Sequence, residues 1–148
     1  MRSMVAILVV LCVAFLFASR AEANDVEDTS EAASPEQQAI ASALLWLELV
    51  DNGEYQASWE AAAEYFKQAV TAEQLEQSLN AVRTPLGNVT AREETSATYA
   101  TELPGAPDGE YVVIQFATSF ENKKSAVETV TPMKEEDGSW KVSGYFIR

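Results

Sequence analysis

The chain has 148 residues, and 23 acidic residues against 10 basic ones set a net charge of −13 at pH 7. A chain this acidic is repelled by phosphate backbones, so nucleic acid is excluded as a partner. The sequence has no histidine and a single cysteine. It therefore lacks the usual pairing of a nucleophile with a histidine base.

The N-terminus predicts a secretory signal peptide over residues 1–23. Arg2 precedes an unbroken apolar run over residues 4–17, and Ala21 and Ala23 are small residues where a signal peptidase cleaves. Cleavage after Ala23 would leave an exported protein, periplasmic or secreted, without a membrane span. Because the apolar run is only somewhat shorter than the roughly 20 residues of a membrane helix, an uncleaved anchor is the alternative.

Removal of residues 1–23 would also remove Cys12, and with it any disulfide or thiolate chemistry. Two basic residues and one acidic residue leave with this segment, so the net charge becomes −14. Residues 24–33 are acidic and poor in large apolar groups, which is typical of a flexible leader. Residues 34–148 are expected to form a single domain with one hydrophobic core.

The first expected helix begins at Ser34 and ends at the turn over residues 51–53. Ser34 caps the helix, Pro35 occupies its first position, and Gln37 completes a capping box. Its apolar stripe follows the three- and four-residue spacing of a helix and consists of Ile40, Ala43, Leu44, Leu47 and Val50.

Two more helices are expected before residue 88. The second begins near Gly53 or Glu54, and its single apolar face consists of Tyr55, Trp59, Ala62, Ala63 and Phe66. The third begins at Thr71, where Gln74 completes another capping box, and ends near Arg83. Its buried stripe is expected to consist of Leu75, Ser78, Leu79 and Val82.

From residue 88 onward the apolar period changes to two, which is typical of strands. Strands are expected within residues 88–102 and over residues 109–120, 125–134 and 140–148, with a tight hairpin turn at 136–139. Three helices followed by a four-stranded antiparallel meander predict an α+β fold, in which a curved sheet packs on a layer of helices.

Two of these strands carry apolar residues on both faces. Within residues 109–120, the core face is expected to hold Val112, Ile114, Phe116 and Phe120. Within residues 140–148, strict alternation places on one face Trp140, Val142 and Phe146. A sheet that is apolar on both faces is usually covered on both. The candidates for an outer homodimer interface are therefore Tyr111, Val113, Tyr145 and Ile147. Strong curvature toward a closed cone is the competing explanation.

The sequence contains no glycine-rich phosphate loop and no paired metal-ligand motif, so we expect no cofactor and no metal site. Glu128 is the one candidate catalytic residue, because it lies mid-strand between Val127 and Val130. Facing an apolar pocket, its carboxyl would have a raised pKa and could act as an acid or a base. Alternation can instead point Glu128 at solvent, beside Lys124 or Lys141.

Aromatic side chains on the helices have two compatible interpretations. Trp46, Tyr55 and Trp59 recur at helical spacing, which favours a place in the core. They can also line a small apolar pocket between the helices and the sheet. Arg83 either interacts with the last carbonyls of its helix or anchors an anionic ligand in that pocket.

Several segments resemble a bacterial family of small exported proteins, domain of unknown function 4019. They are WLELVDNGEYQASW at 46–59, VRTPLG at 82–87, LPGAPDGEYVVIQF at 103–116, ETVT at 128–131 and DGSWKVSGYFIR at 137–148. The resemblance spans about residues 40–148. It implies a cone like that of cystatin-like or nuclear-transport-factor-2-like proteins, and it implies no activity.

The sequence therefore predicts an exported, noncatalytic module that binds a small molecule or a protein partner in the cell envelope. One alternative is a small isomerase or hydrolase-like enzyme with Glu128 as its acid or base. The other is a structural homodimer, closed through the outer face of the sheet.

Overall fold

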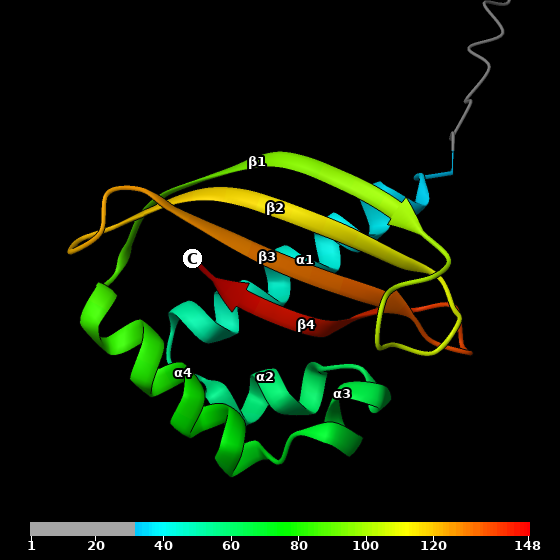
Figure 1. The fold of residues 1–148 in the computed structure, drawn as a ribbon, viewed down its shortest axis with the longest axis horizontal. Coiled ribbons are helices and arrows are strands. Elements are labelled where there is room, and N and C mark those ends of the chain that lie inside the picture. The colour runs from blue at the N-terminus through cyan, green and yellow to red at the C-terminus, as the bar shows by residue number, and fades with distance from the viewer. Residues whose placement is uncertain (1–31) are drawn as a thin grey trace, which may run out of the picture. The chain divides into compact units, whose positions relative to one another are not determined.

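A computed structural model describes residues 32–148 of the chain. The expected signal peptide and nearly all of the expected leader lie outside these residues. The described helices are α1 (Pro35–Asp51), α2 (Tyr55–Ala61), α3 (Glu64–Ala69) and α4 (Ala72–Leu86). The strands are β1 (Val89–Ala100), β2 (Tyr111–Phe120), β3 (Ala126–Lys134) and β4 (Trp140–Ile147). The predicted α+β class is confirmed (Figure 1).

The two long helices begin where the capping pattern predicts. The Ser34 Oγ accepts a hydrogen bond from the backbone N–H of Gln37 at 3.3 Å, and the Gln37 side chain accepts one from the backbone N–H of Ser34 at 2.9 Å. Thr71 and Gln74 form the same reciprocal pair at the start of α4, at 3.2 and 2.9 Å. Each box satisfies two of the backbone donors that a helix leaves without an internal partner.

The single second helix of the prediction is wrong, because two short helices replace it. Ala62 and Ala63 adopt extended backbone between α2 and α3, and both are buried. The Ala63 N–H donates to the Val142 carbonyl of β4 at 2.9 Å. The break therefore exchanges a turn of helix for backbone contact with the edge of the sheet.

The four strands form one antiparallel sheet in the order β1-β2-β3-β4. Helix α1 contacts all four strands, α2 packs on both α1 and α4, and α3 contacts β4. In Figure 1 the sheet is curved, α1 lies behind it, and α2, α3 and α4 lie beside β4. No helix within residues 32–148 combines the length and hydropathy that a membrane crossing requires.

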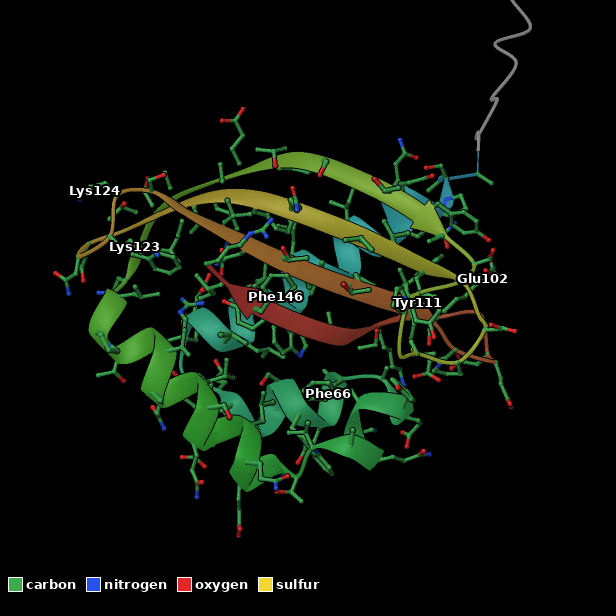
Figure 2. The ribbon with its side chains drawn as sticks, viewed as in Figure 1. Phe66, Glu102, Tyr111, Lys123, Lys124 and Phe146 are labelled. Carbon is green, nitrogen blue, oxygen red and sulfur yellow. The ribbon has the colours of Figure 1, made fainter. Side chains whose placement is uncertain are left out.

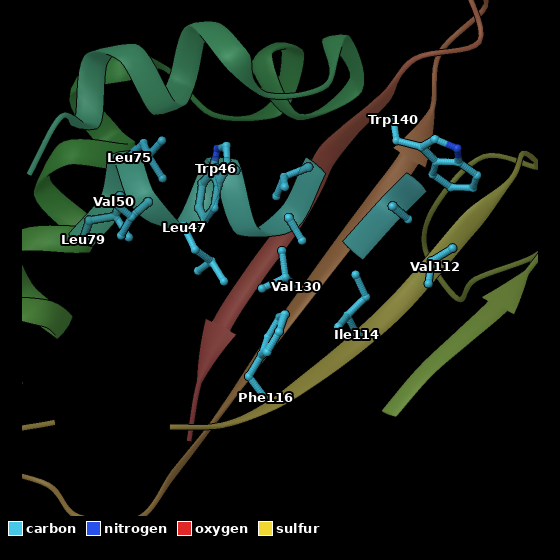
Figure 3. Close-up of a cluster of buried hydrophobic side chains, with 13 residues drawn as sticks. Trp46, Leu47, Val50, Leu75, Leu79, Val112, Ile114, Phe116, Val130 and Trp140 are labelled. Atoms are coloured by element: carbon cyan, nitrogen blue, oxygen red, sulfur yellow. The ribbon is translucent and has the colours of Figure 1, made fainter. Parts of the chain in front are cut away.

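The hydrophobic core lies between α1, α4 and the inner face of the sheet (Figure 3). Ala43, Leu47 and Val50 are buried as expected, but Leu44 is 45% exposed and Trp46 takes its place in the core. On α4, Leu75 and Leu79 are buried, whereas Ser78 and Val82 are exposed. The neighbouring residue, Arg83, is buried in place of Val82, and its side chain belongs to the polar site described below.

A register shift in β4 reverses its expected orientation. Thr131 pairs with Gly144, but the next residue, Pro132, pairs with Val142, so Ser143 is an extra residue in β4. An extra residue inverts period-two alternation beyond it. Trp140 and Val142 are buried in the core, and Tyr145, beyond the extra residue, is partly buried and packs against the same core. Phe146, expected in the core, is 52% exposed (Figure 2).

Candidate functional site

Glu128 is the centre of a buried polar network. Its side chain, on β3, is 0% exposed and accepts hydrogen bonds at both carboxylate oxygens. Oε2 accepts from the Thr118 hydroxyl at 2.6 Å and from the Arg92 Nε at 2.7 Å. Oε1 accepts from the Tyr145 hydroxyl at 2.6 Å and from the Arg92 Nη2 at 3.2 Å. Both oxygens of this buried carboxylate therefore have their hydrogen-bond partners within the protein.

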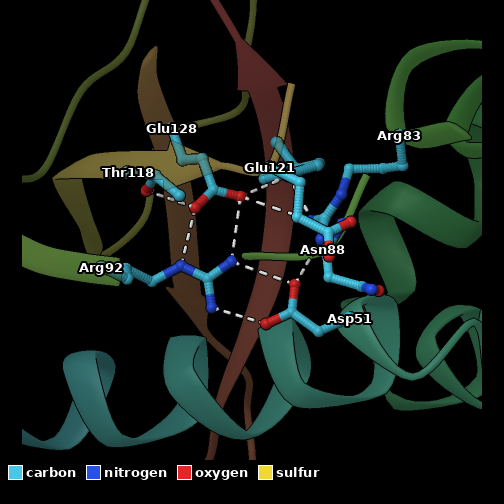
Figure 4. Close-up of polar contacts among 8 residues, drawn as sticks. Asp51, Arg83, Asn88, Arg92, Thr118, Glu121 and Glu128 are labelled. Atoms are coloured by element: carbon cyan, nitrogen blue, oxygen red, sulfur yellow. Dashed lines mark hydrogen bonds and ion pairs between the residues drawn. The ribbon is translucent and has the colours of Figure 1, made fainter. Parts of the chain in front are cut away.

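Asp51 joins two arginines at the end of α1. Its Oδ1 accepts from the Arg83 Nη2 at 2.5 Å, and the Arg92 Nη1 donates to its Oδ2 at 2.7 Å. Arg92 thus lies between Asp51 and Glu128 and contacts each carboxylate through two nitrogens (Figure 4). Two-pronged contacts of this kind are the strongest arginine–carboxylate arrangements.

Arg83 completes the network from α4. Its Nη1 donates to the Tyr145 hydroxyl at 3.2 Å and lies 3.5 Å from the Glu128 Oε1. Its guanidinium carbon lies 5.0 Å from the centre of the Phe120 ring. The Arg83 Nε is buried and has no hydrogen-bond partner within the described residues. One donor of the network is therefore left unmatched.

Six elements each contribute one group to this network. The contributions are Asp51 from α1, Arg83 from α4, Arg92 from β1, Thr118 from β2, Glu128 from β3 and Tyr145 from β4. Two carboxylates face two guanidinium groups, so their formal charges cancel. Pairing of opposite charges lowers the cost of burying these four charged groups.

The network shifts the pKa of its basic and phenolic members. Burial alone would lower the pKa of Arg92, but hydrogen bonds to Asp51 and Glu128 outweigh it and raise that pKa. Burial would likewise lower the pKa of Arg83, and its contacts with Tyr145 and Asp51 raise it instead. Burial, followed by the negative charge of Glu128, raises the pKa of Tyr145 well above its ordinary value. Tyr145 therefore keeps its proton and donates a hydrogen bond to Glu128.

A surface pocket of about 290 Å³ opens beside the network. It lies where the C-terminal ends of α1 and α4 meet the start of β1. The polar residues that line it are Asp51, Asn52, Tyr55, Arg83, Thr84 and Asn88. Gly87 ends α4 there with φ +75°, and a Cβ at this position would meet the Glu121 carboxylate at 2.6 Å. A glycine is thus required for the chain to turn at the pocket wall.

The predicted pocket residues separate into two groups. Tyr55 and Arg83 line the pocket together. Trp46 is a core residue whose Nε1 donates to the Ser58 carbonyl at 2.8 Å, and it borders a separate, apolar depression of about 440 Å³. The Trp59 Nε1 donates to the Val70 carbonyl at 2.7 Å, so this ring connects α2 to the C-terminal end of α3.

The predicted interface residues also lie in different surroundings. Tyr111 is 1% exposed, and its hydroxyl donates to the Pro107 carbonyl at 2.6 Å within the preceding loop. Val113 is half-buried on the outer face of the sheet. Placing Tyr145 and Ile147 on that face was wrong, since Tyr145 packs on Trp46 at 5.2 Å and Ile147 pairs with Glu128. Phe146 occupies the outer face instead.

Sequence reasoning placed Glu128 beside an apolar pocket or beside Lys124 or Lys141, and both placements were wrong. Its partners are Arg83 and Arg92. The prediction assigned Asp51 only to a turn and gave Arg92 and Thr118 no role. The strand pairing indicates that Arg92 faces the core side of the sheet. Arg92 pairs with Thr118, which lies on the same face of β2 as the buried Phe116 and Phe120. The sequence alone does not give this pairing, because it depends on the register of the strands.

The described residues contain no group of three or more acidic side chains arranged to hold a metal ion. No curated protein matches the chain. A family model described as "Protein of unknown function (DUF4019)" matches residues 42–145, a range that contains all six groups of the network. The chain therefore belongs to the DUF4019 family.

Proposed function

We propose that this protein is an exported, noncatalytic module of the cell envelope that binds a small molecule in the pocket beside Arg83. The observation that supports binding is an unmatched donor of the charge network beside an open pocket. Both carboxylates of the network bind arginines, whereas Arg83 borders an open pocket with one donor unmatched. A protein partner that reaches into the same pocket would use the same groups.

The noncatalytic part of the proposal rests on Glu128. A general base must come within hydrogen-bond reach of the proton that it removes. Glu128 is 0% exposed, and four donor groups already occupy its two oxygens. The enzyme alternative would require a substrate to displace Arg92 or Tyr145 from this carboxylate, which would leave a buried charge without its partner.

The small-molecule part of the proposal rests on where the pocket lies. Its walls come from the ends of two helices that the Arg83–Asp51 pair joins. A pocket whose walls are helix ends is largely formed before its ligand arrives, which lowers the entropic cost of binding. Its volume of about 290 Å³ suits a small ligand, and its polar lining does not suit the apolar ligand that the aromatic pattern predicted.

Export is proposed from the sequence pattern of residues 1–23. The N-terminal residue of the protein recovered from outside the cytoplasm tests it: Asn24 is expected, and an intact N-terminus in a membrane fraction would support the uncleaved anchor instead.

Native mass spectrometry of the same sample tests binding. A monomer that carries a removable extra mass is expected, and a bare monomer would contradict binding of a small molecule.

A structural homodimer is the second candidate function, and one observation favours it. Phe146 is 52% exposed and Val113 is half-buried on the face of the sheet opposite the described helices. Exposed apolar groups on one face are typical of association surfaces. A ligand-free dimer that Phe146→Lys converts to a monomer would favour this candidate, and a monomeric wild-type protein would contradict it.

A further inference from the structure

We propose that the Arg83–Asp51 ion pair opens to admit a small zwitterion, whose carboxylate binds Arg83 and whose ammonium binds Asp51. Ligands of this class are α-amino acids and similar molecules with adjacent charges of both signs. The inference rests on the proposed binding function and names the ligand class for the same pocket.

The Arg83 Nε is the donor that a ligand can satisfy. Arg83 has five N–H donors in a planar fork, and its Nε is buried without a partner within the described residues. The Arg83 Nη2 beside it binds only Asp51. A ligand carboxylate on the Nε–Nη2 edge would engage both nitrogens in the two-pronged geometry that carboxylates favour. Because Nε is buried, this contact requires the Arg83 side chain to move toward the pocket.

The Asp51 carboxylate stays paired when Arg83 moves. Movement of Arg83 breaks its hydrogen bonds to the Asp51 Oδ1 and the Tyr145 hydroxyl. Asp51 keeps both of its bonds to Arg92, at 2.7 and 3.1 Å. Asp51 is the more accessible partner of the pair, with 25% of its side chain exposed against 7% for Arg83. Its carboxylate therefore stays in place at the pocket wall with acceptor capacity for an ammonium group.

The balance of charges in the network favours a ligand with no net charge. The network is neutral, since Asp51 and Glu128 balance Arg83 and Arg92. A lone carboxylate in the pocket would face Asp51, and a lone ammonium would face Arg83. The pocket also lies at the C-terminal ends of α1 and α4, whose dipoles disfavour anions. A zwitterion replaces one ion pair by two and keeps the total charge unchanged.

The remaining pocket residues suit such a ligand. Asn52, Thr84 and Asn88 offer uncharged polar groups, and the ring of Tyr55 offers a surface for a small side chain. A volume of about 290 Å³ is at the small end of ligand pockets, which favours a single amino acid over a longer peptide.

The test compares L-alanine with two derivatives that each lack one charge. N-acetyl-L-alanine keeps the carboxylate and loses the ammonium; L-alaninamide keeps the ammonium and loses the carboxylate. Each is titrated into the purified protein while the backbone amide resonances of Gly53 and Gly87 are followed by NMR. We expect L-alanine to shift both resonances saturably, with at least tenfold higher affinity than either derivative.

Equal affinity for N-acetyl-L-alanine would overturn the zwitterion class in favour of an anion site at Arg83. Equal affinity for L-alaninamide would overturn it in favour of a cation site at Asp51, and in both cases the proposed binding function would stand. If none of the three probes shifts the resonances, the zwitterion class falls. The retained mass in native spectrometry then decides the proposed function separately.

A pair of variants locates the effect. Thr84→Trp adds an indole at the pocket wall without removing a network group, and Gln77→Trp places the same indole on the exposed surface of α4. L-Alanine is expected to shift the resonances in Gln77→Trp and not in Thr84→Trp. Identical shifts in both variants would overturn the assignment to this pocket.

Discussion

The Arg92 guanidinium bridges Asp51 and Glu128, with its Nη1 2.7 Å from the Asp51 Oδ2 and its Nε 2.7 Å from the Glu128 Oε2. A single side chain of β1 thus ties the C-terminal end of α1 to β3. These residues are 41 and 36 positions from Arg92 in the chain. The bridge fixes the wall of the pocket relative to the sheet.

Replacement of Arg92 by methionine tests the stabilising role of the bridge. The Arg92→Met variant leaves Asp51 and Glu128 each short of a partner, and removal of one member of a buried pair costs about 3–5 kcal/mol. We expect the free energy of unfolding, measured by urea titration, to fall by about that amount. The exposed Arg148→Met variant is the control, and a similar small loss in both would contradict a structural role for Arg92.

Most of the sheet was predictable from the sequence, because local patterns determine it. The strands over 109–120 and 125–134 differ from β2 and β3 only at their ends, and both capping boxes are present. The break at Ala62–Ala63 was not predictable, because neither a glycine nor a proline marks it and contact with β4 produces it. The extra residue Ser143 has one local signal, the adjacent Gly144, because a glycine inside a strand often marks a bulge.

The candidate site was predictable only in part. Arg83, Tyr55 and Glu128 were candidates because an arginine near a helix end, an aromatic residue at helical spacing and an acid between valines each suggest a role in a pocket. Asp51 and Arg92 were not, since a charged residue in a turn or on a polar strand is ordinary. Their roles depend on which distant residues the topology brings together.

Overpacking tests the exchange of helix for sheet contact at the α2–α3 junction. Ala63 is 0% exposed and donates its N–H to Val142, so the larger side chain of Ala63→Leu would force this backbone away from β4. Overpacking of a well-packed site costs about 1–3 kcal/mol. We expect a loss of that size in urea unfolding, against little change for Ala61→Leu, whose position is exposed. Equal effects would contradict the close contact.

Tyr145 predicts a loss of stability at alkaline pH. Burial and the charge of Glu128 raise the pKa of Tyr145 above its ordinary value of 10.0. Because the folded pKa exceeds the unfolded one, this contribution is complete below pH 10.0 and is lost as the pH rises through the folded pKa. The stability difference between wild type and Tyr145→Phe should therefore shrink above pH 10.0.

At neutral pH the Tyr145→Phe variant should lose about 1.5–3 kcal/mol, the contribution of a hydrogen bond to a charged group. Urea midpoints across a pH series measure both effects. A difference between the two proteins that stays constant from neutral to strongly alkaline pH would contradict the shifted pKa.

Glu121 predicts a loss of stability at acid pH. The backbone N–H of Asn88 donates to the Glu121 Oε2 at 2.9 Å, and this hydrogen bond lowers the pKa of Glu121 below its ordinary 4.5. A depressed folded pKa contributes stability that is complete above pH 4.5 and is lost as the pH falls through the folded pKa. Thermal unfolding of Glu121→Gln should therefore change less with pH in this range than that of the wild type.

Glu102→Gln is the control for this effect, because Glu102 is exposed and lies far from Glu121. In Figure 2 Glu102 lies at the opposite end of the sheet from Lys123 and Lys124, which are in the turn that follows Glu121. Its pH profile should follow that of the wild type. A Glu121→Gln profile that also follows the wild type would show that the Asn88 contact does not stabilise the folded chain.

The most direct test of the central claim, that the protein binds a small molecule beside Arg83, is native mass spectrometry of three proteins purified side by side. They are the wild type, Thr84→Trp and Gln77→Trp, each first shown to have a wild-type urea midpoint. We predict that the wild type and Gln77→Trp carry the same removable mass and that Thr84→Trp carries none. The same mass on all three proteins, or on none of them, would contradict the claim.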